Sequence, residues 1–194
     1  MKLPTALRAL LPAVLLLCLS ASATTMLRAD LPELALSADA IVHGTVRRME
    51  SRWSGDGRKI VTDVEIQVTE TLKGQAGGTV LVTQPGGQVG DIGQKVSGLA
   101  SFASGEEVVL FLERRGPKAF RVAGMAQGKY QVRRSEDGTS AQAVPEPIGD
   151  SVLVDPETRE PTVSALRSMS LAELKASIRT ALQQPPVRAQ EKRP

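Results

Sequence analysis

The stretch Lys59–Thr71, KIVTDVEIQVTET, decides the fold because apolar and polar side chains alternate along it. From Val64 to Val68 every second residue is apolar, so these side chains share one face of an extended chain. This period of two predicts a half-buried antiparallel strand. A β-branched run at 40–46, AIVHGTV, precedes it, and the turn-forming residues WSGDG at 53–57 lie between the two. We therefore expect the two strands to form a long hairpin.

Shorter apolar or alternating runs follow and predict more strands. The segment 124–128, GMAQG, is expected to be a hairpin turn between the last two of them, and Gly44 is expected to bend the first strand. The long stretch 84–105 is rich in glycine, and loops of this length are usually functional or mobile. The further strands are expected at 79–83, 107–112, 120–122 and 129–132.

Two helices are expected, one at each end of the strand region. Asp30 begins a short helix that runs to about Ala38, since Glu33 stands at the capping-box position. Ser170 caps the second, amphipathic helix, which runs to Gln183. Its apolar stripe predicts a helix packed on the sheet. The expected fold is therefore mainly β: a small antiparallel OB-like β-barrel with a short N-terminal helix and a C-terminal amphipathic helix.

Composition and the N-terminus limit the class of protein. The 194 residues are 41% apolar and 23% charged, which excludes collagen, a long coiled coil and a multi-span membrane protein. Residues 1–23 have a basic start, an apolar run too short to span a bilayer and a small-residue end, so we predict a cleaved signal peptide and no transmembrane anchor. We therefore predict a secreted or periplasmic protein.

Cleavage would leave a nearly neutral chain without cysteine. The formal charge of +3 falls to about +1 when Lys2 and Arg8 are removed, and Cys18 leaves with them. The expected parts are the barrel domain at 24–134, a polar, proline-containing linker or edge segment at 135–167, the helix at 168–184 and a disordered tail at 185–194.

Three short motifs resemble one known group of modules. These are ADAIVHGTV at 38–46, the run from Val68 that ends in Leu72-Lys73-Gly74, and GEEVVLFL at 105–112. Together they resemble the netrin-like modules and tissue inhibitors of metalloproteases, and the resemblance extends over about 38–133. It implies an OB-type barrel used for binding. Those inhibitors chelate the protease zinc through an N-terminal Cys, which the expected mature chain lacks, so that inhibitory mode does not transfer.

The sequence offers little chemistry for catalysis. No G-x-S-x-G, H-E-x-x-H or S-x-x-K pattern is present, and the lone His43 is interpreted as an exposed or edge residue. We therefore expect no enzyme, metal site or cofactor. The alternative is a cell-envelope hydrolase with an unrecognised carboxylate site, drawn from Glu106, Glu107 and the face formed by Asp63 and Glu65, in which Glu106 and Glu107 are the residues to test. The simpler interpretation places Asp63 and Glu65 on a solvated face and Glu106 and Glu107 at a strand start.

The predicted function is binding of an exported or envelope protein, with a protease as one candidate partner. Nucleic acid is not expected, because the mature charge is near zero and Trp53 is the one aromatic residue near the basic hairpin. The hypothesised surface combines that hairpin with the glycine-rich stretch, since Trp and Arg dominate interface hot spots and glycine lets a backbone approach closely. Its residues are Trp53, Arg52, Arg58, Gly86, Gly87, Gln88, Gly90 and Gly93.

Overall fold

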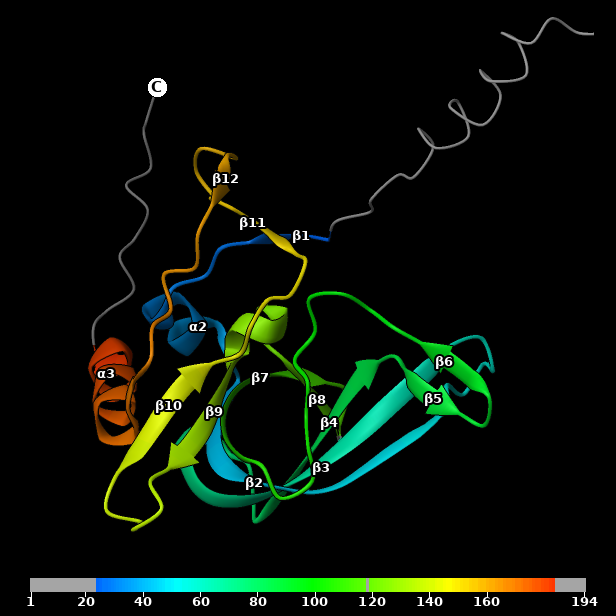
Figure 1. Ribbon diagram of the computed structural model, residues 1–194, viewed down its shortest axis with the longest axis horizontal. Helices are drawn as coiled ribbons and strands as arrows, with labels where there is room; N and C mark the ends of the chain where they lie inside the picture. Colours follow the sequence, from blue (N-terminus) through cyan, green and yellow to red (C-terminus); the bar gives the residue numbers. More distant parts are fainter. Residues whose placement is uncertain (1–23, 118, 184–194) are drawn as a thin grey trace, which may run out of the picture.

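The computed structural model describes residues 24–117 and 119–183. Over these residues the chain is mainly β, as predicted, with two α-helices and one 3-10 helix (Figure 1). The predicted signal peptide and tail lie outside the described residues. The strands are β1 (Thr25–Leu27), β2 (Ala40–Trp53), β3 (Ile60–Lys73), β4 (Thr79–Pro85), β5 (Gly87–Val89), β6 (Ile92–Gln94), β7 (Glu107–Arg115), β8 (Ala119–Val122), β9 (Lys129–Arg134), β10 (Ala141–Pro145), β11 (Val152–Val154), β12 (Pro161–Thr162) and β13 (Met169–Ser170), and the helices are α2 (Leu31–Ser37), η1 (Met125–Gly128) and α3 (Leu171–Gln183).

The predicted long hairpin is confirmed in β2 and β3, which pair antiparallel from Ile41 opposite Lys73 to Trp53 opposite Ile60. The alternation of β3 appears in its burial, because Val64 and Ile66 are buried and the residues between and after them are exposed. The register shifts beside Gly44, where a Cβ atom would lie 2.3 Å from the carbonyl oxygen of Gln67. Only glycine permits that close approach.

The main sheet has the strand order β13-β10-β9-β7-β2-β3-β4-β8, and β7 pairs with β8 as well. The sheet therefore curves back on itself (Figure 1). The closing contact between β4 and β8 is a single bridge, Val82 opposite Phe120. One bridge does not make a continuous seam, so the structure shows a strongly curved sheet and not a clear closed barrel.

The core is divided into two parts by this sheet. Leu110 and Phe111 are neighbours on β7 and point to opposite faces, yet both are fully buried. β7 is therefore covered on both faces, which explains its unbroken apolar sequence. One cluster lies within the curve of the sheet and includes Val64, Ile66, Val82, Leu110 and Phe120. The other lies beneath the helices and includes Leu34, Phe111, Tyr130, Leu174 and Ile178.

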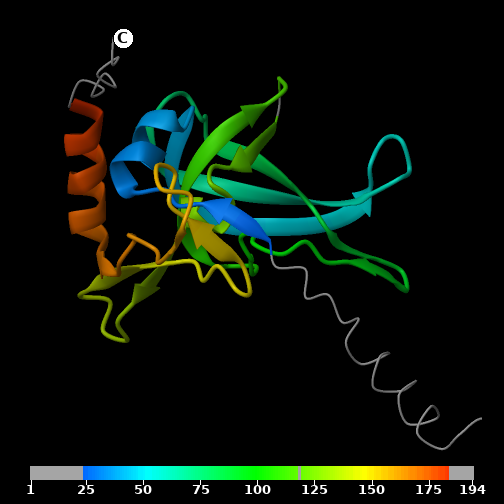
Figure 2. The ribbon, with the colours of Figure 1, turned by 90° about the horizontal axis from the view of Figure 1, so that it is seen from above.

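Both predicted helix starts are confirmed by their caps. The Asp30 carboxylate accepts a hydrogen bond from the backbone N–H of Glu33 at 2.8 Å. The Ser170 hydroxyl accepts one from the N–H of Glu173 at 3.1 Å. Figure 2 shows α2 and α3 side by side at one end of the molecule, while the tip of the β2–β3 hairpin lies at the opposite end. The helices cover one of the two core clusters, and among the described residues no helix covers the hairpin tip.

The predicted hairpin turn at 124–128 is wrong. β8 and β9 both pair antiparallel with β7, first opposite its residues 112–115 and then opposite 108–110. The chain thus continues in one direction along β7 and never reverses between the two strands. The connecting segment forms η1, preceded by Gly124 in the left-handed conformation.

The polar segment 135–167 contributes three short strands. β10 pairs with β9 on one side and with β13 on the other, and so extends the main sheet. β11 pairs in parallel with β1 and antiparallel with β12, so a separate small sheet joins the start of the described chain to residues 152–162. Figure 1 shows this sheet above the helices.

Candidate functional site

The distal end of the β2–β3 hairpin carries Trp53, Arg52 and Arg58. Trp53 is 41% exposed although it is the largest apolar side chain of the protein. Arg52 donates from Nε to the Asp63 carboxylate at 2.7 Å, so its guanidinium is held on the outer face of the sheet. Arg58 is exposed in the turn and forms no ion pair with any other described residue.

Local hydrogen bonds order the turn at this end. The Ser54 hydroxyl donates to the Asp56 carboxylate at 2.6 Å, and the backbone N–H of Ser54 donates to the carbonyl of Lys59 at 2.7 Å. The bond from Ser54 is the main reason that the pKa of Asp56 lies below its ordinary value. Trp53 is therefore presented from an ordered turn.

The glycine-rich stretch folds back onto the same hairpin. The N–H of Gly86 donates to the carbonyl of Ile60 at 2.8 Å, and the Gly86 carbonyl accepts from the Thr62 hydroxyl at 2.7 Å. The N–H of Ile60 donates to the side chain of Gln94 at 2.9 Å. The structure therefore brings together the two segments of the hypothesised surface.

The other predicted residues of this stretch lie in the β5–β6 hairpin. Gly87 sits at its base with φ of +126°, and a Cβ atom there would lie 2.3 Å from the Ser51 hydroxyl. Gln88 donates to the carbonyl of Gly90 at 3.0 Å and so braces the β5–β6 turn. Gly93 has open space around its Cα, so neither crowding nor a positive φ requires glycine there.

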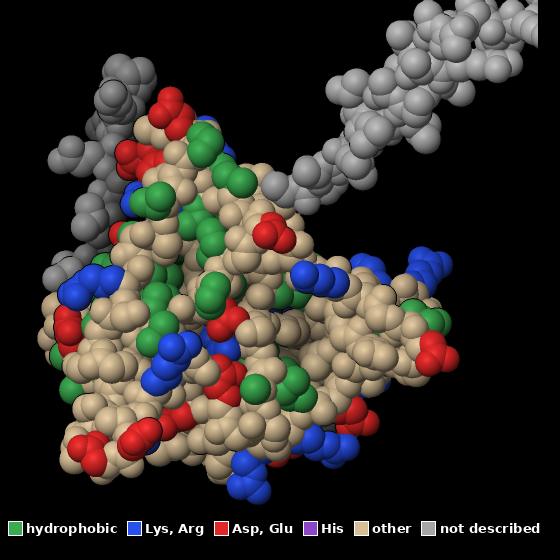
Figure 3. Space-filling model, in the orientation of Figure 1, with side chains coloured by type: hydrophobic (Ala, Val, Ile, Leu, Met, Phe, Trp, Pro, Cys, Tyr) green, Lys and Arg blue, Asp and Glu red, His purple; other side chains and the backbone are tan. Residues whose placement is uncertain are grey.

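A groove of about 370 Å³ separates β2 from the returning chain. Met49 and Ser51 of β2 line it, and so does Phe102 of the chain that returns from β6 to β7. Met49 was not among the predicted residues, and neither was Ile92, which is 56% exposed at the β5–β6 turn. Met49 shares the period-two face of Ser51 and Trp53, and that spacing was the available signal. Figure 3 shows Lys and Arg side chains along the right-hand end of the molecule, where both hairpin tips lie.

His43 is not exposed, which corrects its sequence interpretation. It is 4% exposed, and its ring lies between Glu107, 2.7 Å from Nε2, and the Lys175 ammonium, 3.1 Å from Nδ1. Because an ammonium only donates and a carboxylate only accepts, the neutral ring carries its proton on Nε2. The partner that buries it comes from α3, 132 residues further along the chain.

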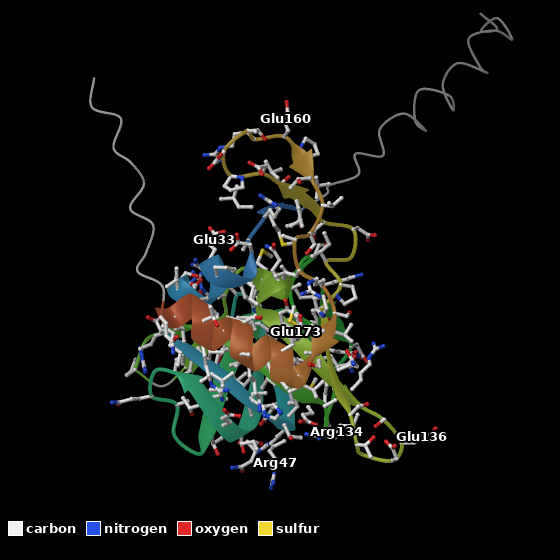
Figure 4. All side chains as sticks on the ribbon, turned by 90° about the vertical axis from the view of Figure 1, so that its left-hand side faces the viewer. Glu33, Arg47, Arg134, Glu136, Glu160 and Glu173 are labelled. Carbon is white, nitrogen blue, oxygen red and sulfur yellow. The ribbon has the colours of Figure 1, made fainter. Side chains whose placement is uncertain are left out.

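Ion pairs continue outward from His43 on both sides. Glu107 accepts from Arg134 at 2.8 Å and 2.7 Å, and this pairing is the main reason that the pKa of Glu107 is lowered. Glu70 accepts from Lys175 at 2.6 Å and from Arg179 at 2.8 Å. Figure 4 looks onto α3, with Arg134 below its first turn. The network attaches α3 to the sheet.

The two adjacent carboxylates of the hydrolase alternative do not face each other. Glu107 joins the His43 network, whereas Glu106 turns to the other side and pairs with the Lys129 ammonium at 2.7 Å. Lys129 is 1% exposed and also pairs with Glu146 at 3.0 Å. Glu106 lies directly before β7 and Glu107 is its first residue, so both stand at a strand start, as the simpler interpretation had it.

The Lys129 cluster holds the returning chain in place. Lys129 donates to the carbonyl of Ser101 and lies 5.0 Å from the ring centre of Phe102. The Ser101 hydroxyl and N–H both donate to Glu146. Burial alone would raise the pKa of Glu146, but the hydrogen bonds from Ser101 and Lys129 outweigh it and lower that pKa. These charges are satisfied internally, which is typical of a structural cluster.

Across residues 24–117 and 119–183, no group of three or more His, Cys, Asp or Glu side chains is placed to hold a metal ion. No helix in that same part of the chain is long and apolar enough to cross a membrane. No protein-family model matches the sequence, and neither does any curated protein. The netrin-like resemblance therefore stays a prediction.

Proposed function

We propose that this chain is an exported binding module without enzymatic activity, and that it holds an exported or envelope protein at its hairpin end. Under this proposal the curved sheet is an OB-like barrel, in which β2, β3, β4, β8 and β7 are the five principal strands. The surface is formed by the β2–β3 tip and the β5–β6 hairpin, with the groove between them.

One observation carries the proposal: exposed apolar side chains from two distant segments lie toward the same end of the molecule, and one of them, Met49, lines a groove. Trp53 and Met49 come from β2 and Ile92 comes from β6, and each is at least 40% exposed. A cluster of this kind beside charged side chains is typical of a protein interface. An exported protease is one candidate partner, and the chain would engage it without a zinc-chelating N-terminus.

The test is cross-linked capture of partners from the extracytoplasmic fraction by the chain that begins at Thr24, read by mass spectrometry. Trp53→Ala and Ile92→Ser are expected to weaken capture of one partner at least tenfold, the loss typical of a hot spot. Val163→Ser is the matched control, since Val163 is 81% exposed and belongs to the segment that follows β12. A partner retained by both hairpin variants would contradict the proposal.

A further inference from the structure

The edge of β2 that faces away from β3 is unpaired over the half of the strand that ends at Trp53. β2 pairs with β7 only from Ala40 to Thr45, whereas its pairing with β3 continues to Trp53. Among the described residues, no strand pairs with the other edge over 47–53. This half is almost entirely exposed and extends beyond the body of the sheet (Figure 2). An exposed strand edge of this kind is a template for another strand.

The register with β3 determines which backbone groups face that edge. Ile60 directs both its N–H and its carbonyl away from β2, to Gln94 and Gly86. Trp53, opposite Ile60, is therefore in a non-hydrogen-bonded pair, and its own backbone groups point to the open edge. The same alternation turns Met49 and Ser51 outward.

When two copies of the segment 49–53 are aligned antiparallel, an acidic residue of one copy lies opposite a basic residue of the other, and an apolar residue lies opposite an apolar one. We propose that two copies of the chain join antiparallel through β2, about a two-fold axis at Ser51. Met49 then faces Trp53 of the second copy, and Glu50 faces Arg52 of the second copy. Each outward-facing residue meets another outward-facing one, as an antiparallel ladder requires. This inference goes beyond the proposed function, because it concerns the protein's contact with itself.

Neighbouring registers are unfavourable. The nearest registers that still pair outward-facing residues are shifted by two residues. One shift places Glu50 opposite Glu50 of the second copy, and the other places Arg52 opposite Arg52 of the second copy. Like charges directly opposite each other destabilise a strand pair. The present partners of these residues do not prevent the proposed pairing, because the Glu50–Arg48 pair is more than half exposed and Arg52 is 50% exposed. Surface pairs of this kind are readily exchanged.

The two-fold axis stands perpendicular to the joined sheet, since the strands run antiparallel in one layer. Met49, Ser51 and Trp53 of both copies therefore lie on the same face. The two grooves open on that face, side by side.

Sedimentation velocity over a concentration series tests the proposal with the chain that begins at Thr24. The contact is small, so we expect a weak dimer that forms as concentration rises. Glu50→Lys sets two cations opposite each other, and Arg52→Glu sets two anions opposite each other. Each variant alone is expected to raise the dimer dissociation constant at least tenfold.

Mixing the two variants provides the decisive measurement. In the mixed pair, Lys at position 50 faces Glu at position 52, and Arg52 faces Glu50. The heterodimer is therefore expected to form at concentrations at which each variant alone is monomeric. A wild-type chain that stays monomeric at every concentration would overturn the proposal. A mixture that stays monomeric would overturn it as well.

Ser51→Pro tests the backbone contact without using charge. The N–H of Ser51 faces the open edge, so proline removes a bond across the two-fold axis and none to β3. Ser51→Ala is the matched control and should still dimerise. A Ser51→Pro chain that remains folded by circular dichroism and still dimerises would exclude this edge. Ile92→Ser lies outside the edge and should leave dimerisation unchanged, so failure here is distinct from failure of partner capture.

Discussion

At the scale of single residues, the hairpin end depends on the close approach of Gly87 to the β2–β3 hairpin. Gly87 passes so near to Ser51 and Thr62 that a Cβ atom would lie 2.3 Å and 2.4 Å from their hydroxyl oxygens. Those two hydroxyls are hydrogen-bonded to each other at 2.9 Å. The absence of a side chain at position 87 therefore lets the glycine-rich segment lie against β2 and β3.

Gly87→Ala is expected to destabilise the protein by about 1–3 kcal/mol, because it combines a strained backbone with a steric clash. Gly93→Ala is the control, since Gly93 has open space and no positive φ. Urea unfolding of both variants measures the difference. Equal stability of the two would show that the approach at Gly87 is not tightly constrained.

At the scale of elements, α3 is held both by an apolar face and by charge. Leu171, Leu174 and Ile178 are buried in the cluster that α3 forms with α2 and the sheet. On its polar side Lys175 and Arg179 pair with Glu70 of β3. The Lys175 hydrogen bond is the largest cause of the lowered pKa of Glu70, whose ordinary value is 4.5.

The stabilisation that Glu70 contributes has a defined pH dependence. Since the folded pKa lies below the unfolded one, the contribution is complete above pH 4.5 and is lost as pH falls through the folded value. Glu70→Gln should remove it at neutral pH and raise amide hydrogen exchange in α3 about two- to fivefold. Glu65→Gln is the control, because Glu65 is exposed on the same strand and forms no ion pair with the other described residues. Unchanged exchange in the Glu70 variant would contradict an electrostatic attachment.

Local sequence patterns predicted where the helices and most strands lie. The predictions that failed concern features that depend on contacts between residues far apart in the sequence. Asp30 and Ser170 located both helix starts, because a cap is formed within four residues. The burial of His43 depends on Lys175, which no local pattern connects to it. The segment 124–128 contains turn residues, but the edge of β7 beside it keeps the chain running forward.

Local sequence patterns also predicted part of the candidate site, namely which residues belong to it, but not how they lie relative to one another. Trp53 and the glycines were visible as unusual residues in turn-rich segments. Their juxtaposition rests on bonds such as that from Thr62 to the Gly86 carbonyl, across 24 residues. The groove beside Met49 depends on the position of the chain between β6 and β7. The buried Lys129 and its ion pairs with Glu106 and Glu146 hold that segment in place.

At the scale of the whole molecule, the two core clusters have different dependence on α3. The cluster within the curve of the sheet has no residue from that helix, whereas the other cluster includes four. Removal of α3 therefore exposes one side of the sheet and leaves the inner cluster intact.

A chain that ends at residue 167 is expected to bind a hydrophobic dye and to lose about 5 kcal/mol or more of unfolding free energy, from the lost burial of three large apolar side chains. A chain that ends at Gln183 retains α3 and serves as the control. Dye fluorescence and urea unfolding measure the effect. Identical unfolding midpoints would mean that the helix adds little to the core.

The parallel pairing of β1 with β11 has a consequence for the order in which the molecule is completed. Thr25 lies opposite Val152, so the first described strand has no partner until more than a hundred further residues have been synthesised. During synthesis, the β2–β3 hairpin can form long before β1 is paired. The first strand of the described chain is thus among the last to be paired, and its pairing joins the start of the described chain to a segment more than a hundred residues further on.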